Sequence, residues 1–304
     1  MKRIDVFAHV LLPNFYGKML AIDPDIPKKY AFFNNIVLQD MEVRKSHWDK
    51  ETKQIISYVN ANPEDITDPA NAEVLCREAN VEISKCVDKY PEMFDGCVGM
   101  LPMNNIEGAV RILKEQIDKD SNMHGVQLFT RHLGKSIADP EFEPVFAALN
   151  ELKMPLWIHP VFDLRKPDNN LIFSWEYELS QAMLQIVQAG YMRKYSDIKI
   201  IIHHAGGMAP FFAGRIDRIL PKEQSEDFRK FYVDTAILGN PKALDLAVDF
   251  FGLDHVVFGT DAPLGILPAG ATKEILEAID DMQLSEDQKE QIRWKNYQKM
   301  LGGK

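Results

Sequence analysis

The sequence predicts an α/β fold: one closed (β/α)8 barrel, or TIM barrel, with an insertion after its first strand. Short β-rich runs alternate with longer amphipathic stretches, which is the order expected of a parallel sheet with covering helices. Eight such runs can be counted, and 304 residues suit one closed barrel with an insertion. No repeat, low-complexity tract or linker divides the chain, so residues 1–304 are predicted to form a single domain.

The predicted strands occupy residues 3–10, 54–61, 95–103, 124–130, 155–161, 198–206, 231–237 and 255–263. Between them, stretches such as EFEPVFAALNELK and PKALDLAVDFFG place apolar residues at helical spacing. Residues 11–53 are the exception, because they form a long, aromatic, Pro-containing segment after the first strand. An insertion there would lie over the mouth of the barrel as a lid. Residues 270–302 predict two helices, the second beginning near Ser285.

Composition and charge limit the classes of partner. Hydrophobic residues make up 46% and charged residues 26% of the chain, which is typical of a soluble globular protein. The formal net charge of −10 argues against nucleic acid and anionic membrane surfaces as partners. No apolar run approaches the length of a membrane span. Cys76, Cys86 and Cys97 cannot all pair and show no C-x-x-C spacing, so we expect buried thiols in a reducing cytoplasm.

Polar side chains stand at the carboxyl ends of four predicted strands, which meet at the mouth of such a barrel. His9 ends the first strand, His159 the fifth, His203 and His204 the sixth, and Asp261 the eighth. A single histidine near a strand end is more often structural than a ligand. Imidazoles and a carboxylate that converge from four strand ends suit zinc or another first-row divalent ion.

Local motifs then resemble a known family. WIHP at 157–160, HHAGGMAPFFAGRID at 203–217 and VVFGTDAP at 256–263 resemble the amidohydrolase superfamily, in the group containing aminocarboxymuconate-semialdehyde decarboxylase and the resorcylate-type decarboxylases. The resemblance runs over nearly the whole chain. It implies that His159 is a metal ligand, that Asp261 is a ligand and proton carrier, and that His204 is the catalytic histidine.

The chain departs from this family pattern at the first strand. The family presents H-x-H or E-x-H there, whereas this sequence reads Phe7-Ala8-His9. Three protein ligands remain by resemblance, His9, His159 and Asp261, which is enough for a catalytic site holding one divalent metal, zinc or manganese. In the alternative, Phe7 fills the space of the metal and the site is metal-free. No organic cofactor is expected.

His203 precedes the catalytic histidine directly. On a regular strand it would point to the opposite face, so a structural role outside the barrel is predicted for it.

Three further residues are predicted to bind substrate. Arg44 lies in MEVRKSHWD, which resembles a family segment that supplies a carboxylate-binding arginine; a salt-bridged helix residue is the alternative. Arg215 follows His204 by eleven residues and matches a family arginine that reaches into the neighbouring subunit, which implies a homodimer. A guanidinium fork suits a carboxylate. Trp157, with the aromatic residues of the insertion, would line the pocket.

The resemblance therefore implies a non-oxidative decarboxylase, a carbon–carbon lyase, acting on a small aromatic or dienoic carboxylate. A hydrolase of an ester, lactone or amide is the first alternative, because the same barrel and nearly the same residues serve both reactions. An attenuated or non-catalytic relative is the second, suggested by Phe7 alone. The sequence contains no dinucleotide fingerprint, P-loop or nucleophile elbow.

Overall fold

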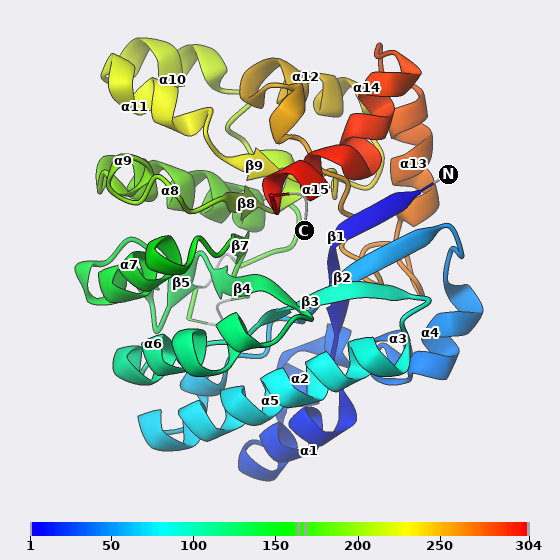
Figure 1. The fold of residues 1–304 in the computed structure, drawn as a ribbon, viewed down its shortest axis with the longest axis vertical. Helices are drawn as coiled ribbons and strands as arrows, with labels where there is room; N and C mark the ends of the chain where they lie inside the picture. The colour runs from blue at the N-terminus through cyan, green and yellow to red at the C-terminus, as the bar shows by residue number, and fades with distance from the viewer. Residues whose placement is uncertain (1, 163–164, 167–168, 303–304) are drawn as a thin grey trace.

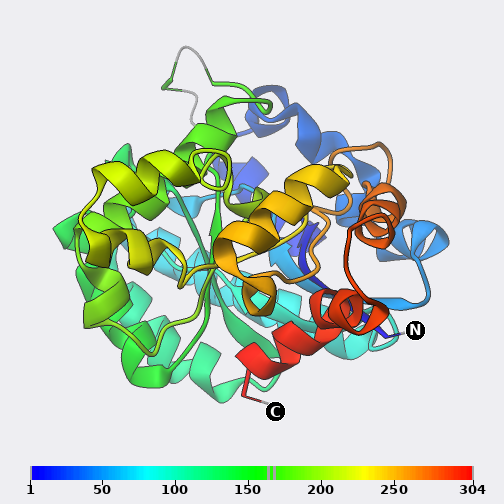
Figure 2. The ribbon, with the colours of Figure 1, turned by 90° about the horizontal axis from the view of Figure 1, so that it is seen from above.

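A computed structural model describes residues 2–162, 165–166 and 169–302; the two extreme ends of the predicted domain lie outside this range. Within it, parallel strands curl into a barrel and helices surround them (Figures 1 and 2). The prediction of a TIM-type α/β barrel is confirmed.

Seven strands form one parallel sheet in the order β1-β2-β3-β4-β7-β8-β9. Their bounds are β1 Arg3–Val10, β2 Thr52–Tyr58, β3 Phe94–Gly99, β4 Met123–Phe129, β7 Leu156–His159, β8 Ile200–Ile202 and β9 Tyr232–Val233. Two short strands, β5 Arg131–His132 and β6 Lys135–Ser136, form a separate antiparallel pair. Each of the seven overlaps its predicted run.

The eighth predicted strand, 255–263, is an irregular segment that still closes the barrel. Val257 N donates to Val233 O over 2.9 Å on one side. On the other side Asp261 N donates to Phe7 O over 2.9 Å and His9 N to the Ala262 carbonyl over 2.7 Å. Because both neighbours are hydrogen-bonded, the segment supplies the eighth wall without forming a continuous ladder.

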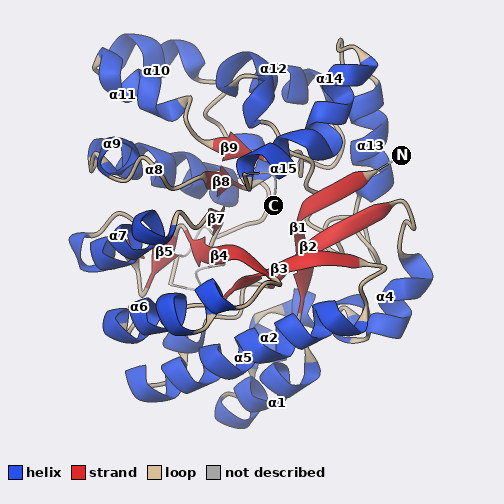
Figure 3. Cartoon of the chain, in the orientation of Figure 1, coloured by secondary structure: helices blue, strands red, loops and turns tan. Residues whose placement is uncertain are grey.

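Helices lie on the outside of the strands, as Figure 3 shows by colour. Their bounds are α1 Pro13–Ile22, α2 Ile26–Lys29, α3 Ile36–Gln39, α4 Met41–His47, α5 Pro69–Lys89, α6 Ile106–Glu115, α7 Glu143–Leu152, α8 Ser174–Gln188, α9 Tyr191–Lys194, α10 Ala213–Ile219, α11 Lys222–Phe228, α12 Pro241–Phe251, α13 Thr272–Asp280, α14 Glu286–Glu290 and α15 Asn296–Met300. The predicted helix start near Ser285 is confirmed, because Ser285 and Gln288 form a capping box there.

The interior of the barrel below its mouth is filled by a compact apolar cluster. Trp157 belongs to this cluster, together with Phe7 and Ile201, and all three side chains are buried. The Trp157 indole N–H donates to Val6 O over 2.8 Å. Its predicted place in a substrate pocket is therefore wrong. Trp157 precedes His159 by two residues on the same strand face, so it lies one layer deeper in the barrel.

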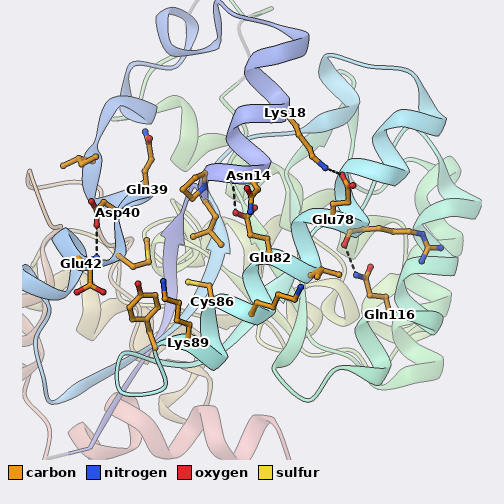
Figure 4. Close-up of a pocket in the computed structure, with 18 of the residues that line it drawn as sticks. Asn14, Lys18, Gln39, Asp40, Glu42, Glu78, Glu82, Cys86, Lys89 and Gln116 are labelled. Carbon is orange, nitrogen blue, oxygen red and sulfur yellow. Dashed lines mark hydrogen bonds and ion pairs between the residues drawn. The ribbon is translucent and has the colours of Figure 1, made fainter.

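The insertion between β1 and β2 carries α1 to α4. Its middle part reaches the loops beyond the strand ends: the Tyr30 and Phe32 rings lie 5.7 and 5.8 Å from the Phe162 ring, and Asn35 Nδ2 donates to Pro263 O over 3.2 Å. The role of the insertion as a lid stays a prediction. Its first helix packs on the outside of the barrel, beside the groove drawn in Figure 4, where Glu82 of α5 accepts hydrogen bonds from the first amides of α1.

The three cysteines are buried free thiols, as predicted. In the described part of the chain, each helix is too short or too polar to cross a membrane.

Candidate metal centre and active site

Four side chains converge at the mouth of the barrel. They are His9 at the end of β1, His159 at the end of β7, His203 just beyond β8, and Asp261 in the closing segment. One nitrogen or oxygen of each lies within 4.8 Å of all the others. The three imidazoles are fully buried and Asp261 is almost so. We call these four residues the metal cluster.

Each imidazole of the metal cluster is held through Nδ1. His9 Nδ1 lies 2.9 Å from Ser57 Oγ, and His159 Nδ1 donates to Pro160 O over 2.6 Å. His203 Nδ1 pairs with the Asp234 carboxylate. Fixing Nδ1 in this way orients the ring and leaves Nε2 for the common centre, which is how metal-binding histidines are usually arranged.

The inward-facing atoms are left without hydrogen bonds. Among the described residues, this is true of Nε2 of His9, His159 and His203 and of Asp261 Oδ1, although the atoms are buried. Asp261 Oδ1 lies 3.0 Å from His9 Nε2 and 3.4 Å from His203 Nε2. Buried polar atoms without partners are costly, typically about 1–3 kcal/mol each. Because a divalent cation would satisfy all of them at once, the residues fit the predicted metal.

The charge states of His9, His159 and Asp261 suit a cation as well. Burial lowers the pKa of His9 and lowers that of His159 well below its usual value, so both rings are neutral. Burial alone would raise the pKa of Asp261, but the rings of His203, His204 and His9 hold it well below the ordinary range. Neutral imidazoles and an ionised carboxylate are the forms that bind metal.

His203 does not point outside the barrel, and that prediction was wrong. β8 ends at Ile202, and the backbone then turns through left-handed conformations, with φ of +52° at His204 and +53° at Ala205. Since Ile201 faces the interior cluster, His203 two residues later faces inward too. The turn then brings the next residue, His204, to the mouth as well.

His204 lies beside the metal cluster and is paired with a carboxylate that the sequence did not reveal. Its Nδ1 lies 2.8 Å from Glu176 Oε1 on α8, and its Nε2 lies 3.9 Å from Asp261 Oδ2. Burial opposes the charged form, but Glu176 and Asp261 raise the pKa of His204 well above its usual value. The two oxygens of Asp261 thus face different groups: Oδ1 faces Nε2 of His9 and His203, and Oδ2 faces Nε2 of His204.

A family model described as amidohydrolase matches residues 57–303. The chain belongs to this family. A 6-methylsalicylic acid decarboxylase of Penicillium expansum is 29% identical over 264 residues, which cover 80% of this chain and 79% of the relative. A 2-amino-3-carboxymuconate-6-semialdehyde decarboxylase of Dictyostelium discoideum is 26% identical over 336 residues, covering 99% of this chain and 91% of the relative.

Solved structures share the amidohydrolase fold. The 5-carboxyvanillate decarboxylase of Novosphingobium aromaticivorans, solved with manganese and 4-hydroxy-3-methoxy-5-nitrobenzoic acid, superposes with a TM-score of 0.86 at 21% identity. The match covers 99% of this chain and 96% of that one. At this identity the likeness establishes the fold alone.

The position of Arg44 in the structure does not fit its predicted role in binding the substrate carboxylate. The guanidinium is buried, donates from Nε and Nη2 to Gln54 Oε1, and donates from Nη1 to His9 O over 2.8 Å. Burial lowers the pKa of Arg44 to about 10. Since internal acceptors occupy the fork, Arg44 holds the backbone of a cluster residue instead of presenting charge to a carboxylate.

Arg215 lies on α10, and its side chain is exposed. Every residue of α10 is exposed or half-buried. Large apolar side chains flank the arginine, with Phe211 76% and Ile219 64% exposed. The predicted role of Arg215 in substrate binding stays a prediction.

Two carboxylates that pair with histidines of the site, Asp234 and Glu176, were not predicted from the sequence. Asp234 follows β9 directly, so the test of polar residues at strand ends could have found it. Glu176 lies in the first turn of α8 and carries no comparable signal, because only the tertiary fold brings it to His204.

Proposed function

We propose that this amidohydrolase is a non-oxidative decarboxylase that removes carbon dioxide from a small aromatic or dienoic carboxylate. The observation that carries the proposal is the position of Asp261 between two groups: its Oδ1 faces the buried, unsatisfied nitrogens of the cluster histidines, and its Oδ2 faces Nε2 of His204. The decarboxylases of Penicillium expansum and Dictyostelium discoideum support the substrate class.

His9, His159 and Asp261 would hold one divalent ion, zinc or manganese. When bound, such an ion supplies positive charge that orients an anionic substrate and stabilises negative charge developing on it. The manganese of the 5-carboxyvanillate decarboxylase supports manganese as the first ion to test. The protein itself contributes a binding site shielded from water, since the three imidazoles of the metal cluster are fully buried.

His204 supplies the proton. In decarboxylation the bond between the substrate carbon and the carboxylate carbon breaks, the electron pair stays on that substrate carbon, and carbon dioxide leaves. A proton must then take its place. Glu176, whose Oε1 lies 2.8 Å from His204 Nδ1, raises the pKa of His204 and favours its charged form, so its Nε2–H can donate that proton. His204 is then neutral, and Asp261 Oδ2, 3.9 Å from its Nε2, can relay a replacement proton from water.

The deciding experiment measures carbon dioxide released from a panel of carboxylates that includes 6-methylsalicylate and 5-carboxyvanillate, with manganese or zinc added. Ester, lactone and amide substrates in parallel test the hydrolase alternative. Asp261→Asn should lower turnover by at least about 1000-fold in a folded protein, because a neutral amide neither carries a proton nor balances the metal charge. Activity near wild type in folded Asp261→Asn would remove Asp261 from the mechanism.

The active unit of the proposed enzyme is a homodimer in which α10 faces the partner. The exposed Phe211, Phe212 and Ile219 lie near Arg215 in the chain, and large apolar residues with an arginine are typical of an interface core. The second copy would bring Arg215 to a substrate carboxylate. This accounts for an arginine that lies on the surface of its own chain.

A further inference from the structure

Phe7 lies directly against the metal cluster, and its ring is buried with the interior core. The ring stacks on the imidazole of His203, with centroids 3.8 Å apart and planes at 21°. Its centroid is 5.7 Å from that of His9. Position 7 therefore contributes no ligand atom, but it supports the plane of His203 from one side.

His203 presents its nitrogen to the cluster as the other two histidines do. Its Nε2 lies 3.4 Å from Asp261 Oδ1, and its ring centroid is 5.0 Å from that of His159. The ring is fully buried, and its Nε2 makes no hydrogen bond to the described residues. A structural histidine of this kind would be expected to have a partner on both nitrogens.

Asp234 fixes the orientation of His203. Its Oδ2 pairs with His203 Nδ1, while its Oδ1 accepts from Ala205 N over 3.2 Å and from Ala236 N over 2.9 Å. The carboxylate is thus immobilised by two backbone amides and holds the proton on Nδ1. Nε2 then carries the lone pair toward the cluster, in the carboxylate–histidine–metal arrangement.

We infer that His203 is a fourth protein ligand of the metal, oriented by Asp234, so that the ligand lost at Phe7 is supplied from the end of β8. The inference rests on the proposed function, because it concerns the same ion. The complete set is His9, His159, His203 and Asp261.

His204, the neighbouring residue, is not an equivalent candidate. Its Nδ1 is bound to Glu176, its Nε2 approaches the other oxygen of Asp261 at 3.9 Å, and it is not one of the four converging groups. The two adjacent histidines therefore have different roles: His203 binds the ion, and His204 acts on the substrate.

The test compares metal binding in three proteins. His203→Leu alone would leave Asp234 as an unpaired buried carboxylate, so it is combined with Asp234→Asn, whose amide oxygen can still accept from the two backbone amides. The matched control is His132→Leu with Glu64→Gln. It removes another buried histidine–carboxylate pair, with Nδ1 and Oε1 2.6 Å apart, outside the metal cluster.

Each protein is stripped with a chelator and titrated with manganese and with zinc by calorimetry. X-ray absorption of the zinc-loaded forms then counts imidazole ligands. We expect one ion and three imidazoles in wild type and in the control. The His203→Leu/Asp234→Asn protein should bind the ion at least about 100-fold more weakly and show two imidazoles, because loss of an outer partner alone costs about 10–100-fold.

Unchanged affinity and imidazole count in folded His203→Leu/Asp234→Asn would overturn the ligand assignment and leave the proposed decarboxylase standing. Three imidazoles in a wild-type protein that releases no carbon dioxide from any carboxylate would support the ligand assignment and overturn the proposed function. A wild-type protein that binds neither ion would overturn the ligand assignment and the metal dependence together.

Discussion

Asp5 joins the first and last walls of the barrel beneath the active site. It accepts hydrogen bonds from Thr260 N and Oγ1, over 3.0 and 2.6 Å, and from Gln54 Nε2 over 3.2 Å. Gln54 in turn accepts from Arg44, which holds the carbonyl of His9. The backbones of two cluster residues, His9 and Asp261, are therefore tied to one buried network. Burial raises the pKa of Asp5 to about 6.

This raised pKa predicts a pH dependence of stability. The folded protein keeps the Asp5 proton up to about pH 6, whereas the unfolded chain loses it near the ordinary aspartate pKa of 3.8. Between these values the folded state binds more protons, so the contribution of Asp5 to stability falls as pH rises and is constant above about pH 6. Relative to Asp5→Asn, wild type should lose up to about 3 kcal/mol between pH 4 and pH 7.

Urea unfolding of both proteins across this pH range measures the difference. Altered hydrogen bonds in Asp5→Asn contribute a constant offset, so only the slope reports the carboxyl group. A difference that does not change with pH would show that Asp5 titrates normally in the folded protein.

Phe7 offers a second test at the scale of single residues. In the His203→Leu/Asp234→Asn background, Phe7→His should restore metal affinity by about 10-fold or more, because the ring at position 7 already lies against the cluster, with its centroid 5.7 Å from that of His9. The added substitution removes a buried ring and should destabilise the metal-free protein by about 2–4 kcal/mol. Added metal should recover part of that loss through linkage.

Calorimetric titration and thermal melts with and without manganese test both effects. If Phe7→His gives no gain in affinity in this background, residue 7 does not lie within reach of the ion.

At the scale of elements, the first helix of the insertion depends on a side chain from another helix. Leu12 precedes α1 and cannot cap it, so Glu82 of α5 accepts from Asn14 N over 2.9 Å and from Phe15 N over 2.8 Å. Glu82→Ala should lower the free energy of unfolding by about 1–2 kcal/mol, the usual cost of a lost helix cap. Glu78→Ala removes only an exposed ion pair with Lys18 and serves as the control.

Denaturant unfolding of the two variants decides this point. Equal stabilities of Glu82→Ala and Glu78→Ala would mean that the α1 amides find other partners. The same comparison tests the insertion as a lid: if it covers the site, only Glu82→Ala should also raise KM.

At the scale of the whole molecule, the proposed dimer makes each active site from two chains. Arg215→Ala and His204→Ala subunits should each be inactive alone. After verified exchange they should recover about a quarter of wild-type activity, because half of the subunits lie in mixed dimers and one site of each mixed dimer regains both groups. Absence of recovery would place the action of Arg215 within its own chain or outside the reaction.

The sequence alone predicted the barrel, because the alternation of β-rich and amphipathic runs is a local property. It can be recognised without knowing which residues are in contact. The sequence also predicted that His9, His159, His204 and Asp261 lie at strand ends, and strand ends meet wherever such a barrel closes. The start of the last helical segment at Ser285 was equally readable, since a cap is made by neighbours in the chain.

Tertiary structure alone decided which way the side chains face. The run IKIIIHH is apolar on both strand faces, so its pattern does not show which residues point into the barrel. The register with β7 places His203 in the metal cluster, and the left-handed turn that begins at His204 brings His204 to the mouth. The burial of Arg44 and Trp157 and the pairing of Glu176 with His204 likewise join residues far apart in the chain. Such contacts depend on how the walls of the barrel pack, and no local signal encodes them.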